Sequence, residues 1–129
     1  MNILAIDYGK KNIGLAWMQD GLDFVLPFGI IDSVGPAVSD LAELLKEEKS
    51  DMLVVGLPLG LDGKENPNTR AVREFVGEVR AMVRIPIEFV DERFSSRAAD
   101  SMGGDATRDE KAAMFILQTY VDKNGFRNG

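Results

Sequence analysis

The fold is decided near the start of the chain, by the sequence Ile3-Leu4-Ala5-Ile6-Asp7-Tyr8-Gly9-Lys10-Lys11-Asn12-Ile13-Gly14-Leu15-Ala16-Trp17. Two apolar runs flank a polar turn at Gly9, a pattern typical of a β-hairpin with strands over residues 3–7 and 13–18. Asp7 closes the first of these strands. A carboxylate there is costly to bury unless a metal ion, a phosphate held through a metal, or a hydrogen-bonded neighbour satisfies it. Asp7 is therefore the first candidate site residue.

The rest of the chain alternates between strand and helix patterns. Further strands are expected over residues 24–31, 52–55 and 87–90. Helices are expected from Pro36, from Asn66-Pro67, after Ser95 or Ser96, and from the capping box that begins at Thr107. The predicted order is β-β-β-α-β-α-β-α-α, an antiparallel meander followed by two parallel crossovers, which is an α/β fold.

Composition fits one packed domain without a membrane segment. The 129 residues are 45% hydrophobic and 28% charged, and we assign a single domain to residues 1–123 with a frayed tail over 124–129. No apolar run approaches the roughly 18 residues of a membrane-spanning helix. The N-terminus has no basic region before its apolar run and does not resemble a signal peptide. A membrane partner is therefore not expected.

The chain contains neither cysteine nor histidine. This excludes disulfides, thiolate or imidazole zinc sites, and Ser-His-Asp catalysis. Catalysis would have to use carboxylates, lysines, hydroxyls or a metal ion held by oxygen atoms. Oxygen ligands favour Mg²⁺ or Mn²⁺ as the cofactor.

The net charge of −6 is unevenly distributed along the sequence. Residues 1–63 hold 4 basic and 10 acidic residues, whereas residues 64–129 hold 11 of each. An acidic balance argues against strong non-specific binding of nucleic acid. It does not exclude a locally basic rim around one site.

Acidic residues recur where predicted strands end or helices begin. Asp91 and Glu92 follow the fifth strand, and Asp109 lies in the first turn of the last helix. The carboxyl ends of parallel strands meet at one edge of an α/β sheet, so these residues can converge on Asp7. Three neighbouring carboxylates stay ionised together only with cations between them, an arrangement suited to two-metal phosphoryl transfer.

Each of these acids also has a plain structural explanation. Asp7 could accept hydrogen bonds from the amides of its own turn. The helix dipole alone favours an acid at Asp109. Glu92 could form a weak surface ion pair with Arg93 or Arg97.

Basic residues cluster in the loops and helix starts at the same predicted end. They form a candidate phosphate-holding rim, against the alternative of scattered solubilising charge. The nucleic-acid-binding candidates are Lys10, Lys11, Lys64, Arg93, Arg97, Arg108 and Lys111.

Four sequence blocks together resemble the YqgF/RuvX family, whose members are described as Holliday junction resolvases or pre-16S rRNA nucleases. The blocks cover nearly the whole chain in order: Asp7-Tyr8-Gly9-Lys10-Lys11-Asn12-Ile13-Gly14-Leu15-Ala16, Val54-Val55-Gly56-Leu57-Pro58, Val90-Asp91-Glu92-Arg93-Phe94-Ser95-Ser96, and Asp109-Glu110-Lys111-Ala112-Ala113 with Ile116-Leu117-Gln118-Thr119-Tyr120.

The resemblance implies an RNase H-like fold, a five-stranded mixed sheet of order 3-2-1-4-5 with helices on both faces. It implies a cytoplasmic, Mg²⁺-dependent endonuclease that cuts an rRNA precursor or branched DNA. The ribosome is a possible partner, and the expected state is a monomer or weak homodimer. By position, the catalytic and metal-binding acids would be Asp7, Glu92 and Asp109, with Asp91 the less favoured neighbour of Glu92.

Two departures from the family pattern keep other functions open. Asn12 stands where a basic residue is usual, and the loop from Met102 to Thr107 is short and lacks basic residues. Both reduce the phosphate-binding surface. The second hypothesis is therefore a nucleic-acid or ribosome-assembly binding module with little or no catalysis. A third, a nucleotide-binding fragment of the sugar-kinase or actin type, would need two related domains.

Overall fold

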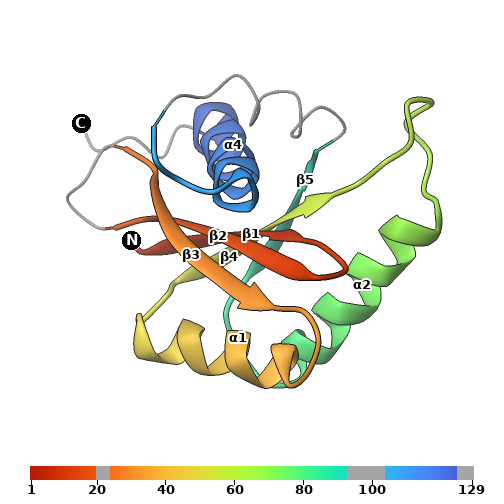
Figure 1. The fold of residues 1–129 in the computed structure, drawn as a ribbon. Coiled ribbons are helices and arrows are strands. Elements are labelled where there is room, and N and C mark those ends of the chain that lie inside the picture. The colour runs from red at the N-terminus through yellow and green to blue at the C-terminus, as the bar shows by residue number, and fades with distance from the viewer. Residues whose placement is uncertain (20–23, 93–103, 125–129) are drawn as a thin grey trace.

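A computed structural model describes residues 1–19, 24–92 and 104–124 of the chain. One five-stranded sheet of order β3-β2-β1-β4-β5 lies between two helical layers. Helix α4 covers one face of the sheet, and helices α1 and α2 cover the other (Figure 1). This architecture confirms the α/β prediction and the strand order implied by the resemblance.

The first three strands form the predicted antiparallel meander. β1 (Ile3–Tyr8) pairs with β2 (Asn12–Met18), and Asp7 lies opposite Gly14 in this pair. β3 (Leu26–Asp32) pairs with β2 at the edge of the sheet and starts two residues later than predicted, because the ladder with β2 begins at Leu26. β4 (Met52–Leu57) and β5 (Ile87–Asp91) extend the sheet in parallel from β1.

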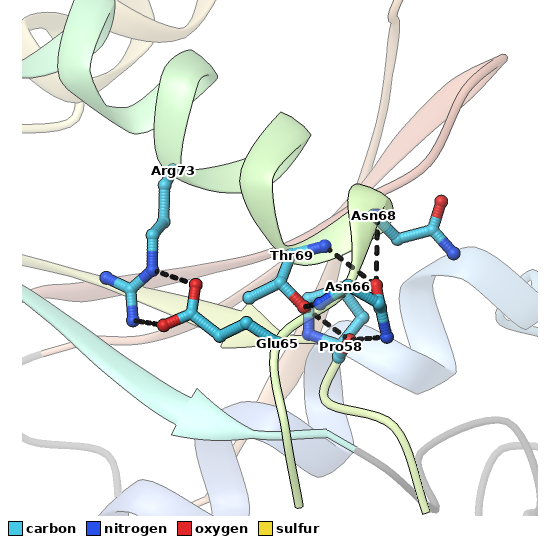
Figure 2. Close-up of polar contacts among 6 residues, drawn as sticks. All are labelled: Pro58, Glu65, Asn66, Asn68, Thr69 and Arg73. Carbon is cyan, nitrogen blue, oxygen red and sulfur yellow. Dashed lines mark hydrogen bonds and ion pairs between the residues drawn. The ribbon is translucent and has the colours of Figure 1, made fainter.

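Helix α1 (Ala37–Glu47) follows Pro36, which is its N-cap rather than its first helical residue. Helix α2 (Pro67–Arg80) begins where Asn66-Pro67 predicted it. The Asn66 side chain accepts hydrogen bonds from the backbone N–H groups of Asn68 and Thr69 at 2.9 and 3.1 Å (Figure 2). Asn66 and Thr69 also donate to the carbonyl of Pro58, at 3.2 and 2.9 Å. These bonds fix the start of α2 against the end of β4.

Helix α4 (Arg108–Asn124) begins with the predicted capping box. The Thr107 N–H donates to Glu110 Oε1 at 2.9 Å, and the Glu110 N–H donates to Thr107 Oγ1 at 3.1 Å. The other carboxylate oxygen of Glu110 accepts a 2.7 Å bond from the Gly29 N–H. Glu110 therefore ties the start of α4 to strand β3.

The core is divided by the sheet into two layers. On β1, Leu4 and Ile6 pack with α1 and α2, whereas Ile3 and Ala5 pack with α4. Successive strand residues point to opposite faces, so Asp7 lies on the α4 face. In the described segments, no helix is long and apolar enough to cross a membrane.

Candidate active site

The carboxyl ends of β1, β4 and β5 and the start of α4 bring the predicted acids to one edge of the sheet. Glu92 follows β5 directly, and its N–H donates to the Leu57 carbonyl of β4 at 3.1 Å. Glu92 as a whole residue is 7% exposed. Asp7 is partly buried, and its side chain is hydrogen-bonded to that of Glu92. The fold thus joins two acids that are distant in sequence.

Two glycines make room for this convergence. A Cβ atom at Gly56 would lie 2.8 Å from Glu92 Cδ and 3.0 Å from Glu92 Oε2, and would overlap the Ile116 side chain. A Cβ atom at Gly14, opposite Asp7, would overlap the backbone carbonyl of Asp109. The missing side chains let Glu92 and the first turn of α4 lie directly against the strands.

The electrostatics of Asp7 reflect this crowding. Burial raises the pKa of the Asp7 carboxyl above its ordinary value of 3.8, and the negative charge of Asp109 raises it further. The hydrogen bond with Glu92 and the positive charge of Arg108 act in the opposite direction. Asp109 and Arg108 therefore both lie near enough to Asp7 to influence its ionisation.

The structure separates Asp91 from Glu92, which the sequence left as neighbouring alternatives. Asp91 is the last residue of β5, pairs with Leu57 and is exposed. Glu92 is buried against Gly56 and bonded to Asp7. The geometry favours Glu92 as the partner of Asp7.

The acid group has the chemistry of a divalent-cation site without a preformed ligand shell. All its donors are carboxylate oxygens, and a bound cation would offset the burial and the negative charge of Asp109 that raise the pKa of Asp7. In residues 1–19, 24–92 and 104–124, no three acidic side chains already stand in a metal-holding arrangement. The residues fit an oxygen-bound metal ion, and Asp109 would complete its shell by approaching Asp7 and Glu92.

The structure describes only some of the basic residues predicted to form a rim around the site. Lys10 lines the cleft beside the acids, and Arg108 acts electrostatically on Asp7. Lys11 and Lys64 are exposed, the former at the β1–β2 turn and the latter in the β4–α2 loop; Lys111 lies half-buried in the first turn of α4. Arg93 and Arg97, together with the helix expected after Ser95 or Ser96, lie outside the described residues.

A cleft of about 380 Å³ opens beside the acids. It runs from Asp7, Glu92 and Lys10 across the sheet edge to the first turns of α2. Residues with no role assigned from sequence also line it: Tyr8, Pro58, Leu59, Asn68, Ala71 and Val72. Tyr8 and Pro58 stand within the family-like blocks; Asn68 and Ala71 carry no sequence signal, because α2 reaches the site only through the fold.

A family model described as RuvX, Holliday junction resolvase, matches residues 1–123. The chain belongs to the RuvX family. RuvX relatives with similar sequences include a protein of Maridesulfovibrio salexigens, 36% identical, with 94% of this chain and 98% of the relative aligned. Another, from Cupriavidus pinatubonensis, is 39% identical over 94% of this chain and 88% of its own length. Both are named as proposed pre-16S rRNA nucleases.

Solved structures of resolvases share the fold of this RuvX member. Thermus thermophilus RuvC in complex with a Holliday junction substrate superposes with a TM-score of 0.61 at 12% identity, covering 96% of each chain. The fowlpox virus Holliday junction resolvase gives a TM-score of 0.62 at 17% identity, covering 95% of this chain and 99% of its own. Similarity at this level establishes a common RNase H-like architecture.

Proposed function

We propose that this RuvX protein is a metal-dependent endonuclease that hydrolyses phosphodiester bonds of structured nucleic acid. The carrying observation is the partly buried Asp7, hydrogen-bonded to the buried Glu92 and subject to the charge of Asp109, at the carboxyl ends of the parallel strands. An acid group of this kind, without histidine or cysteine, suits phosphoryl transfer assisted by oxygen-bound cations.

The proposed residue roles follow from position. Asp7, Glu92 and Asp109 would hold Mg²⁺ or Mn²⁺, and two such ions would supply an activated water and charge stabilisation for the leaving oxygen. The chain itself contributes orientation: Gly14 and Gly56 let the acids approach, and Glu110 fixes the helix that carries Asp109. Lys10 and Arg108 add positive charge where flanking phosphates would lie.

The proposed substrates are the precursor of 16S rRNA, branched DNA, or both. The relatives named as proposed pre-16S rRNA nucleases support the first, and the resolvase description of the family supports the second. We propose that cleavage takes place in the cytoplasm, where both substrates occur in bacteria.

The test compares two single-charge changes at one sheet edge. Purified wild type, Asp7→Asn and the matched control Asp91→Asn are incubated with Mn²⁺ and end-labelled precursor RNA or four-way-junction DNA. We expect Asp7→Asn to lose about 100-fold or more in rate, because charge stabilisation of the transition state is removed. Asp91→Asn changes an exposed residue, and its cleavage rate should stay within about twofold of the wild-type rate. Equal cleavage by wild type and Asp7→Asn would refute the proposal.

A second candidate function is binding without cleavage, for example in ribosome assembly. It is favoured by the net charge of −6 and by the lack of a preformed three-acid ligand set among the described residues. Isothermal titration with Mn²⁺ distinguishes the two functions. A protein that binds no Mn²⁺, alone or with nucleic acid, is a binding module rather than a metal-dependent nuclease.

A further inference from the structure

The cleft beside the acids has two chemically different ends. At one end lie the carboxylates of Asp7 and Glu92, with Lys10 at the side. At the other end, on the side of α2, the lining is mainly apolar, with Tyr8, Leu59 and Val72 beside the polar Asn68. A site for the scissile phosphate alone would need only the first end. The apolar end is therefore open to another part of a bound nucleotide.

Two residues of the cleft lining, Tyr8 and Pro58, are held by contacts with α2 and its N-cap. The Tyr8 ring packs on Phe75, with 4.8 Å between ring centroids. Elsewhere in the lining, the Pro58 carbonyl accepts hydrogen bonds from both Asn66 and Thr69, which tie the β4–α2 connection to the start of α2 (Figure 2). Walls held in this way form a pocket before any ligand arrives.

The dimensions and polar groups of the cleft suit one nucleotide unit. Its volume of about 380 Å³ falls within the range of roughly 300–1,000 Å³ found for small-molecule sites. Ala71 is small and exposed, which keeps the cleft open toward solvent. The Asn68 carboxamide points away from the Asn66 cap in Figure 2 and forms no side-chain hydrogen bond with the described residues. A carboxamide both donates and accepts, as the edge of a base requires.

We propose that this cleft receives the base and sugar of an unpaired nucleotide next to the bond that is cut. The inference rests on the proposed nuclease function, because it takes the scissile phosphate to lie at Asp7 and Glu92. A base stacked inside a duplex cannot enter such a cleft, whereas an unpaired base can be turned out and held between apolar walls. The protein would then select strands with an unpaired residue at the cleavage point, at a precursor end or a junction.

The experiment fills the cleft without touching an acid. Ala71→Trp is compared with Ala81→Trp, the same change at the exposed C-terminal end of the same helix. Both are made in an Asp7→Asn background without divalent metal, so that binding is measured apart from cleavage. The probes are a fluorescein-labelled single-stranded oligoribonucleotide and its blunt duplex, followed by fluorescence anisotropy.

We expect the Asp7→Asn protein to bind the single strand more tightly than the duplex. Ala71→Trp should weaken single-strand binding about tenfold, as expected for the loss of one held base, and leave duplex binding unchanged. Ala81→Trp should bind both probes as tightly as the Asp7→Asn protein without it. Asn68→Ala, an exposed position that tolerates change, should weaken single-strand binding severalfold and provides the test if the Ala71→Trp protein does not fold.

The inference is overturned if neither cleft variant weakens binding of the single strand, or if a cleft variant weakens binding of the single strand and the duplex equally. It is also overturned if the Asp7→Asn protein does not bind the single strand. These outcomes are separable from the nuclease test. Cleavage by wild type with full binding by Ala71→Trp would refute the cleft assignment alone. Absence of cleavage in Mn²⁺ with selective loss of binding in Ala71→Trp would refute the nuclease function and leave the cleft as a nucleotide-binding site.

Discussion

Replacing Gly14 by alanine should separate the third acid from the other two. Gly14 lies opposite Asp7 in the β1–β2 pair, and an added Cβ would overlap the backbone carbonyl of Asp109. A backbone atom cannot avoid the new methyl group by rotating about a side-chain bond. The first turn of α4 must therefore move away from the sheet and carry Asp109 with it.

The expected loss of stability follows from two opposing effects. Forcing a methyl group into a packed contact costs about 1–3 kcal/mol. Replacing glycine in a strand interior returns about 0.5–1 kcal/mol of backbone entropy. The net loss is about 1–2 kcal/mol, because the neighbour that must move is backbone, and this lowers the unfolding midpoint by roughly 3–10 °C for a chain of this size. Activity should fall on the order of 100-fold, since a displacement of about 1 Å at a reacting group costs that much.

Gly77 supplies the matched control for this substitution. It is exposed on α2, and a Cβ atom there would meet nothing within 4 Å. Gly77→Ala should raise stability by about 0.5–1 kcal/mol through helix propensity and leave cleavage unchanged. Thermal unfolding followed by circular dichroism and the Mn²⁺ cleavage assay give both readings. A Gly14→Ala protein as stable and as active as wild type would show that α4 does not depend on this close approach.

Three further substitutions test other parts of the site. Because the folded-state pKa of Asp7 is raised, the native state binds the Asp7 proton more tightly, and the contribution of Asp7 to stability without metal should fall as pH rises from 3.8 through the raised pKa. Asp7→Asn should remove this contribution and stabilise the protein at neutral pH by about 0.5–2 kcal/mol. Urea titrations of wild type and Asp7→Asn at pH 4 and pH 7 check the sign, because the stability difference between the two proteins should grow from pH 4 to pH 7. Mn²⁺ should raise the unfolding midpoint of wild type but not of this variant. Partial burial acts to raise the pKa of Glu110, but hydrogen bonds from Thr107 and Gly29 outweigh it and leave this pKa lowered. The contribution of Glu110 to folding stability is therefore present above pH 4.5 and lost as pH falls through the lowered pKa. Glu110→Ala should reduce stability by about 1 kcal/mol at neutral pH and by less in acid, and thermal melts at a series of pH values would detect the difference. Asn66→Ala removes the N-cap of α2 and should lower the free energy of unfolding by about 1–2 kcal/mol. The control Asn68→Ala should change it by less than about 0.5 kcal/mol in the same thermal melts.

Much of the fold could be predicted because local sequence signals coincide with tertiary requirements. The Gly9 turn, the Asn66-Pro67 helix start and the capping box at Thr107 each satisfy backbone groups by local chemistry, and each is present in the structure. The observed strand boundaries differ from the predicted ones where pairing with a neighbouring strand decides them, as it does for β3. Its bond from Gly29 to Glu110 joins residues distant in sequence, and no local pattern encodes such a contact.

The sequence indicates which acids can lie together at one end of the sheet, but it does not indicate the other residues that line the cleft. Asp7, Glu92 and Asp109 stand at strand and helix ends, where position alone indicates a shared edge. The family resemblance already favoured Glu92 over Asp91, and the burial of Glu92 beside the exposed Asp91 supports that preference. Asn68 and Ala71 become cleft residues only because α2 is fixed against the end of β4.

The three acids come from elements that span almost the whole chain, and α4 contacts all five strands. A molecule in which α4 has not docked holds Asp7 and Glu92 without Asp109, under an uncovered apolar sheet face. Such a molecule lacks the complete acid set even when its first hairpin and its cleft are formed. Under the proposed function, cleavage would therefore depend on the docking of α4, and a chain whose α4 has not yet packed on the sheet would not cut nearby RNA.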